Sequence, residues 1–277
     1  MSIQYILGNS GSGKTFYLYE EVRRLAKENP NETFYIVVPE QYTMQTQRDF
    51  VLGSEQACII NIDVVSFDRL AYRIFDELGM QQIEVLDDMG KNLLLQKIIQ
   101  ECKDQLKIFT KNIEKPGYID QIKSLISEFE QYQIETENLT ENVDFNSNPV
   151  LYTKIEDLTL IFDKFRNYMS EKLITNEELL HVFAQNIHRS TKLKNATFVF
   201  EGYTGFTPVQ EKVVEELARV GKKLLFTILI DRNDDFKKVG EKYHLFYMSR
   251  KYIKQVHNIG ERTHCMLEDP VILNGEN

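Results

Sequence analysis

A glycine-rich loop near the start of the chain, from Gly8 to Thr15, restricts the fold more than any other feature. Its sequence, GNSGSGKT, matches the pattern G-x-x-x-x-G-K-[ST] at every position. A chain can wrap phosphate groups with backbone N–H groups only where side chains are absent, which explains the glycines. The Lys14 ammonium can reach the β- and γ-phosphates, and the Thr15 hydroxyl can hold Mg²⁺. The pattern predicts an ATP-binding loop made of Gly8, Asn9, Ser10, Gly11, Ser12, Gly13, Lys14 and Thr15.

The residues around this loop have the pattern that such a site requires. Residues 3–7 (IQYIL) are mostly apolar and predict a short buried strand that ends at the loop. Leu18, Val22, Leu25 and Ala26 then recur at helical spacing, and Asn29-Pro30 ends the predicted helix. The alternative, a glycine-rich turn that binds nothing, does not account for the strand–loop–helix order.

Strands and helices alternate over the first part of the chain. Residues 33–38 and 59–65 read as buried strands, and helices are expected at 44–51 and 67–78, the second capped by Ser66. Such alternation predicts an α/β fold with a parallel sheet flanked by helices, of the P-loop NTPase (RecA-like) class.

The pattern changes between residues 86 and 189, where only helical periodicity is seen. Apolar faces recur around residues 94–102, 118–129, 151–169 and 179–187, and Thr175-x-x-Glu178 predicts a capping box. A polar loop is expected at 142–149. The order of these strand and helix patterns along the chain predicts a discontinuous RecA-like core, residues 1–85 and 190–277, with an inserted all-α subdomain at 86–189.

The α/β pattern returns after residue 190. Residues 196–200 and 224–230 predict buried strands, which lead into Glu201-Gly202 and Asp231. Thr207 and Gln210 predict a capping box, with Pro208 at the first helical position. A last helix is expected near residues 243–256. No further strand or helix is evident in the residues that follow it.

Composition excludes several classes of protein. The 277 residues carry a net charge of −9, which argues against a basic footprint over the whole domain but allows a local basic groove. Cys58, Cys102 and Cys265 are far apart and show no metal-ligand spacing, so reduced thiols in a cytoplasmic protein are expected, without structural zinc. The five histidines form no ligand pattern. No apolar run is long enough to span a bilayer and no signal peptide is seen, so no membrane association is expected.

Several segments together resemble one family. The N-terminal glycine loop, the segments VVPEQ and VVSFDRLAYRIF, the helical insertion and EGYTGFTPVQ look like the N-terminal part of the AddB family, which is similar to superfamily 1 DNA helicases. The resemblance covers the chain up to about Asp231. GNSGSGKT is generic, whereas the VPEQ and EGYTGFTP segments are more specific.

The resemblance implies a role in a larger assembly. AddB partners an AddA-type subunit in a bacterial ATP-dependent helicase/deoxyribonuclease for recombinational double-strand-break repair, with single- and double-stranded DNA as further partners and a role in scanning for the Chi signal. Family members are several times longer. Their C-terminal nuclease domain holds an iron–sulfur cluster, which has no counterpart here, so the chain is interpreted as a fragment with ATP and Mg²⁺ as cofactors.

The predicted nucleotide site departs from that of active helicases. Such enzymes end a second strand in Asp-Glu, where the Asp orients Mg²⁺ and the Glu activates water. Here the strand ends in Glu201-Gly202, and no Gln follows Asp231 within reach. Glu201 is a candidate Mg²⁺ ligand, with a strand-end cap as the alternative, and Gly202 has no carboxylate. We expect nucleotide binding with weak hydrolysis and assign no catalytic residue.

The same resemblance suggests contacts with single-stranded DNA. Pro39, Glu40 and Gln41 follow the second strand, and Ser66 and Arg69 follow the third, where superfamily 1 helicases touch the strand. A simple loop at 39–41 and a helix cap at Ser66 are the alternatives. Two other functions stay open: a scaffold for the AddA partner with a structural P-loop, and a small-molecule kinase, against which the helical insertion and the lack of an arginine-rich lid count.

Overall fold

The computed structural model describes residues 1–53, 61–81, 83–109, 115, 117–132, 134, 148–169, 173–231 and 238–274. Cys58, the first residues of the strand predicted at 59–65, most of the predicted loop at 142–149 and residues 232–234 lie outside these ranges. The chain forms two compact units, Met1–Gly79 with Leu180–Asn277, and Met80–Leu179.

Strands and helices of both units are numbered in chain order. The strands are β1 (Ser2–Gly8), β2 (Phe34–Val37), β3 (Ile62–Val65), β4 (Glu84–Leu86), β5 (Leu173–Thr175), β6 (Thr197–Phe200), β7 (Lys223–Leu229), β8 (Met266–Leu267) and β9 (Val271–Leu273). The α-helices are α1 (Lys14–Glu28), α2 (Thr43–Leu52), α3 (Phe67–Glu77), α4 (Asp88–Glu101), α5 (Tyr118–Gln131), α7 (Pro149–Tyr168), α8 (Asn176–Asn186), α9 (Pro208–Val220) and α10 (Tyr247–Thr263). Short 3₁₀ turns lie at Glu40–Tyr42 (η1) and Ile187–Arg189 (η3).

The first unit is built on a parallel sheet. Its strand order is β3-β2-β6-β7-β1-β8, and β9 also pairs with β1. β1 pairs with β7 in register from Ser2 opposite Lys223 to Gly8 opposite Leu229. The predicted parallel α/β fold is therefore confirmed, in an arrangement consistent with a RecA-like domain. β8 and β9 were not predicted; they occupy the edge beside β1.

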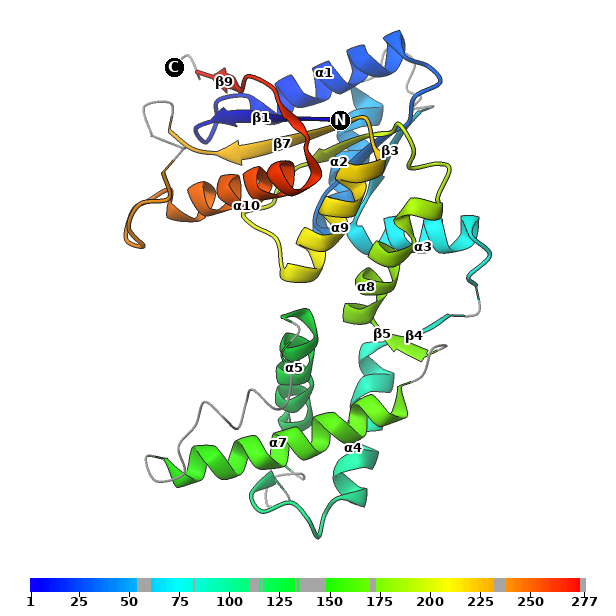
Figure 1. The fold of residues 1–277 in the computed structure, drawn as a ribbon, viewed down its shortest axis with the longest axis vertical. Coiled ribbons are helices and arrows are strands. Elements are labelled where there is room, and N and C mark those ends of the chain that lie inside the picture. Colours follow the sequence, from blue (N-terminus) through cyan, green and yellow to red (C-terminus); the bar gives the residue numbers. More distant parts are fainter. Residues whose placement is uncertain are drawn as a thin grey trace. The chain divides into compact units, whose positions relative to one another are not determined.

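Helices cover both faces of this sheet (Figure 1). On one face, α1 and α2 pack Leu18, Val22 and Phe50 against buried strand residues such as Ile36. On the other face lies a group of aromatic rings in mutual contact: Phe67, Phe200, Tyr203, Phe206, Phe226 and Tyr252. Phe200 and Phe226 stack with ring centroids 4.9 Å apart. The two packed faces hold the carboxyl ends of the strands at fixed positions.

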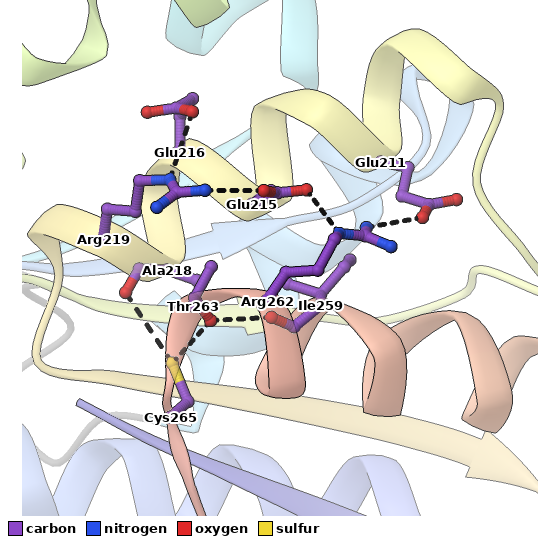
Figure 2. Close-up of polar contacts among 9 residues, drawn as sticks. All are labelled: Glu211, Glu215, Glu216, Ala218, Arg219, Ile259, Arg262, Thr263 and Cys265. Atoms are coloured by element: carbon purple, nitrogen blue, oxygen red, sulfur yellow. Dashed lines mark hydrogen bonds and ion pairs between the residues drawn. The ribbon is translucent and has the colours of Figure 1, made fainter.

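Charged side chains join α9 to α10 (Figure 2). The Arg262 guanidinium on α10 donates to Glu211 at 2.8 Å and to Glu215 at 2.9 Å. Arg219 also donates to Glu215, at 2.7 Å. These contacts hold the C-terminal half of α10 against α9.

The helix starts agree with the predicted caps. Ser66 accepts a hydrogen bond from Arg69 N at the start of α3, and Thr207 forms the predicted capping box with Gln210 at the start of α9. Thr175 and Glu178 bond reciprocally at 3.1 Å, as the capping-box pattern requires. The last predicted helix, 243–256, begins later and ends later in the structure, at Tyr247–Thr263.

The second unit, Met80–Leu179, is mainly helical. The α4, α5 and α7 helices share one core that includes Leu95, Ile99, Ile126, Phe162 and Phe165. It also contains the short parallel pair β4–β5, which the all-α interpretation of this block did not include. Each of these strands has only three residues, too few to produce a clear alternation in the sequence.

Candidate nucleotide-binding site

The glycine loop joins β1 to α1 at the carboxyl edge of the sheet. β1 ends at Gly8 and α1 begins at Lys14, with Gly13 as the N-cap residue. Gly11 and Gly13 have φ values of 75° and 80°, a region that favours glycine over residues with a Cβ atom. The free N–H groups of the first helical turn therefore face the loop, where the helix dipole favours an anion.

Gly8 meets a second restriction. A Cβ atom at this position would lie 2.4 Å from Ser12 Oγ and 2.8 Å from the carbonyl oxygen of Leu273, on β9. The loop can therefore curl only around a residue without a side chain. β9, which the sequence did not predict, packs the loop from this side.

Lys14 points back into its own loop. Its ammonium donates hydrogen bonds to the carbonyl oxygens of Gly8, at 2.9 Å, and Asn9, at 2.6 Å. Partial burial lowers the pKa of Lys14, and the nearby charge of Glu201 opposes this effect. A phosphate bound at the loop would replace two neutral acceptors by a charged one, which makes a stronger hydrogen bond.

The end of β7 fixes the loop from the sheet side. Ile230 N donates to the carbonyl oxygen of Gly8 at 3.1 Å, and the Asn9 side chain donates to the Asp231 carboxylate at 3.1 Å. Asp231, which the sequence suggested only as a strand-end residue, thus helps to position the loop. This interaction depends on the pairing of β1 with β7, which residue spacing does not show.

Glu201 is a buried carboxylate close to Lys14 and Thr15. It follows β6, and its N–H donates to Val37 O at 3.1 Å. Burial raises the pKa of Glu201, while hydrogen bonds from the Thr15 and Tyr19 hydroxyls lower it and only partly offset the burial. Glu201 Oε2 is buried and accepts no hydrogen bond in the described part of the chain.

These features fit a bound Mg²⁺–nucleotide. A buried carboxylate oxygen without a partner is costly, and a cation that also touches the Thr15 hydroxyl would satisfy it. Ser12 Oγ, inside the loop, is likewise buried without a hydrogen-bond partner among the described residues. Oxygen ligands of this kind suit Mg²⁺, and the loop N–H groups with Lys14 suit the phosphates.

The backbone at position 202 disfavours any residue with a side chain. Its φ is 80°, and a Cβ atom would lie 3.3 Å from Pro39 Cδ. The backbone at this position therefore favours glycine, and the acidic residue that activates water in helicase-type ATPases has no equivalent in the Glu201-Gly202 pair.

The structure brings together part of the predicted DNA-contact set. The Arg69 guanidinium pairs with the Glu40 carboxylate at 2.8 Å, with each side chain about half exposed. A hydrogen bond from Ser66 lowers the pKa of Glu40, burial opposes the shift, and Arg69 reinforces it. Pro39 caps the η1 turn and Gln41 is exposed within it. Glu40, Ser66 and Arg69 thus form one cluster at the ends of β2 and β3.

Tyr19 was not predicted to belong to the site. It lies one turn after Thr15 on α1, and its hydroxyl oxygen lies 3.5 Å from Thr46 Oγ1 on α2. Burial and the charge of Glu201 both raise the pKa of Tyr19. Its spacing of four residues from Thr15 indicates that the two side chains share one face of the helix. The apolar pattern of the helix alone, however, assigns such a tyrosine to the core.

Metal clusters and membrane spans are both absent from the residues that the structure describes. No group of three or more His, Cys, Asp or Glu side chains in this part of the chain is placed to hold a metal ion. No helix there is long and apolar enough to cross a membrane.

The parallel sheet, its flanking helices and the glycine loop after β1 define an α/β protein whose candidate site lies at the carboxyl edge of the strands. The family model described as "ADDB, N-terminal" matches residues 5–277. The chain belongs to this family.

Curated relatives share one name, which describes each as the B subunit of an ATP-dependent helicase/deoxyribonuclease. The relative from Lachnoclostridium phytofermentans is 34% identical over 278 aligned residues, and the one from Clostridium kluyveri is 30% identical over 273. These alignments cover 100% and 99% of the chain but only 24% of each relative. A relative from Alkaliphilus metalliredigens is 31% identical, with 22% of its length covered. The chain therefore spans about a quarter of the length of these relatives.

Proposed function

We propose that this chain is the nucleotide-binding N-terminal region of the B subunit of a bacterial ATP-dependent helicase/deoxyribonuclease. The relatives' names support the assembly, because a B subunit implies at least one partner. On this proposal the partner is an AddA-type subunit, the substrates are single- and double-stranded DNA, and the role is recombinational repair of double-strand breaks in the cytoplasm.

The buried, unpartnered Glu201 Oε2 beside Thr15 is the observation that carries nucleotide binding. Thr15 and Glu201 would hold Mg²⁺, which when bound neutralises charge on the β- and γ-phosphates. Lys14 would exchange its two carbonyl partners for phosphate oxygens, and the N–H groups between Gly8 and Thr15 would surround them.

Hydrolysis by this site is proposed to be weak. Glu201 is placed for the metal, and Gly202 offers no base to take a proton from water. Loss of a positioned general base typically slows such a reaction by about 10²–10⁴-fold. The site would thus leave bound ATP largely intact and signal its presence within the larger complex.

Contact with single-stranded DNA is proposed at the ends of β2 and β3. Gln41 is exposed there, and Arg69 is held by Glu40 in a position from which it can also meet a phosphate. Because Glu40 competes for this guanidinium, the affinity at this cluster would be modest and sensitive to salt.

One observation favours a second candidate, a scaffold in which the loop is structural. Lys14 is already satisfied by Gly8 and Asn9, and the loop is held by Asp231 and β9. In that case Lys14→Ala would destabilise the chain, and nucleotides would bind neither the original protein nor the variant.

Binding of a fluorescent ADP analogue with and without Mg²⁺ separates the two candidates. We expect Mg²⁺ to tighten binding to the original chain, and Glu201→Gln to remove most of that gain while retaining the Mg²⁺-independent affinity. Asp49→Asn, which changes a carboxylate near Glu201, is the control. Mg²⁺-dependent affinity that survives Glu201→Gln unchanged would contradict the assigned role of Glu201, and ATP turnover at helicase-like rates would contradict weak hydrolysis.

A further inference from the structure

Helix α4 of the second unit displays large apolar side chains to solvent. Met89 is 72% exposed, and Leu93, one turn later, is 62% exposed. Gln96 and Gln100 on the same helix are exposed as well. These positions follow the spacing i, i+4, i+7 and i+11, which is that of a helix face that packs against another helix. We call this set the α4 outer face; it consists of Met89, Leu93, Gln96 and Gln100.

The opposite side of α4 is fixed within its own unit. Its apolar side chains belong to the core that α4 shares with α5 and α7. Lys91 is 2% exposed, and its ammonium lies 3.0 Å from Ser127 Oγ and 3.4 Å from the Glu130 carboxylate, both on α5. The Asn92 side chain donates to the Asp120 carboxylate at 2.9 Å. Because α4 cannot turn without breaking these contacts, the α4 outer face is directed away from this core.

The charges around the apolar part of this face are negative. The charged residues between Met80 and Met89 are exposed and acidic: Glu84, Asp87 and Asp88. Lys97, further along the helix, lies 3.9 Å from the Glu101 carboxylate and 4.7 Å from the centre of the Tyr168 ring on α7. Its positive charge is therefore already partly compensated, whereas the carboxylates before Met89 give this end of the face a negative potential.

The charge of the whole unit has the same sign. Residues 80–179 contain 19 acidic and 11 basic side chains, a net charge of −8, whereas the chain as a whole carries −9. Nearly all of the net charge of the chain thus lies in the second unit. Such a surface repels phosphate backbones and attracts cationic partners, which disfavours a nucleic acid as the occupant and favours a basic protein segment.

We propose that the α4 outer face is a docking surface for a basic amphipathic helix of a protein partner. Met89 and Leu93 would pack against the apolar stripe of that helix, and its lysine or arginine side chains would meet the carboxylates that precede Met89. Helices recognised in this way present apolar anchors at helical spacing, and charge selects among possible partners. No residue of this face belongs to the proposed nucleotide site, so the two proposals stand independently.

Two synthetic amphipathic helical peptides with identical leucine positions test the apolar contribution. One carries lysine at all other positions and the other carries glutamate. We expect the lysine peptide to bind the 277-residue chain in fluorescence anisotropy and the glutamate peptide not to bind. Met89→Ser/Leu93→Ser should weaken binding at least about tenfold, because two apolar side chains no longer become buried. The matched control, Val150→Ser/Leu151→Ser, removes two other exposed apolar side chains from the same unit and should leave binding unchanged.

The charge contribution has its own pair of variants. We expect Glu84→Gln/Asp88→Asn to weaken binding of the lysine peptide about three- to tenfold and to make it less sensitive to salt. Asp104→Asn/Asp163→Asn neutralises two other exposed carboxylates of the same unit and should change binding by less than about twofold. Thermal melting of each variant distinguishes lost binding from lost folding.

Several outcomes would overturn the proposal. They include no binding of the lysine peptide, equally tight binding of the glutamate peptide, and equal weakening by the two serine pairs. Self-association of the original chain that Met89→Ser/Leu93→Ser abolishes would assign the face to a second copy of the chain instead. A lower Tm of that variant would show that the face is covered within the fold of the chain itself, whereas the proposal predicts an unchanged Tm.

Discussion

At the scale of single residues, the contrast between Glu201 and Gly202 defines the candidate site. Glu201 is buried with one oxygen unsatisfied, which is unfavourable unless a cation or a proton joins it. Gly202, the next residue, is kept free of a side chain by its backbone angle and by Pro39. The local geometry therefore supports binding of a metal–nucleotide and disfavours the machinery of rapid hydrolysis.

Substitution of Gly202 tests this interpretation. We expect Gly202→Ala to lower the free energy of unfolding by about 1–2 kcal/mol, because a Cβ atom is strained at positive φ. Gly202→Glu should be at least as destabilising and should add no ATP turnover. Gly79→Ala is the control, since Gly79 has φ 70° with open space around it and should show the backbone cost alone. A stable Gly202→Glu variant with restored turnover would show that the site needs only the missing carboxylate.

The residues of the loop could be predicted from sequence because their chemistry is local. Glycines, a lysine and a threonine at fixed spacing indicate a phosphate site before any fold is known. Tyr19 and Asp231 could not be found in this way, since their roles depend on how α1 lies against α2 and on β1 pairing with β7. The same holds for Leu273, which approaches Gly8 from a strand that sequence periodicity did not indicate.

At the scale of elements, α3 holds the segment that leads into β6. Glu77, at the end of α3, accepts hydrogen bonds from the Ser190 and Thr191 hydroxyls and from Thr191 N–H, at 2.6 to 2.8 Å. Burial opposes ionisation of Glu77, but these hydrogen bonds together outweigh it, so the pKa of Glu77 is lowered. β6 carries Glu201 at its other end, so this interaction also steadies the site.

A lowered pKa implies stability that depends on pH. The contribution of Glu77 should be complete above the ordinary carboxyl pKa and lost as pH falls through the lower value in the folded state. We expect Glu77→Gln to cost about 1–2 kcal/mol at pH 7 and progressively less below about pH 4. Asp76→Asn, at the exposed neighbour, is the control. A Glu77→Gln penalty that stays constant between pH 7 and about pH 3, measured by urea unfolding, would contradict this assignment.

A buried carboxylate on α7 holds a backbone segment of the second unit. Asp157 on α7 accepts hydrogen bonds from the backbone N–H groups of Lys107, Ile108 and Phe109, at 2.7 to 3.1 Å. We expect Asp157→Ala to destabilise this unit by about 3 kcal/mol, because three backbone donors lose their acceptor. Asp163→Ala, at an exposed position of the same helix, should change stability by less than about 0.5 kcal/mol. Equal effects of the two substitutions in urea unfolding would contradict this role.

Elements with strong local signals were the ones that sequence predicted well. Ser66, Thr207 and the Thr175–Glu178 pair started helices where expected, because caps act through neighbouring residues. The strands β4, β5, β8 and β9 were missed because each has two or three residues and depends on a partner elsewhere in the chain. Tertiary pairing, not local propensity, creates such strands.

At the scale of the whole molecule, the chain aligns with about a quarter of the length of its curated relatives. Its parallel sheet places the glycine loop and the Glu40–Arg69 pair at ends of strands in one sheet. The proposed function, nucleotide binding with slow hydrolysis beside a contact with DNA, rests on this placement of residues at one end of the sheet.

The most direct test of this account is thermal unfolding of the 277-residue chain with a non-hydrolysable ATP analogue and Mg²⁺. At a hundredfold excess over Kd, binding should stabilise the folded chain by about 2.7 kcal/mol and raise its Tm. Lys14→Ala should abolish most of that shift, and Lys27→Ala, in the last turn of the same helix, should retain it. No shift in the original chain, or an equal shift in Lys14→Ala, would contradict the claim that Gly8 to Thr15 bind nucleotide.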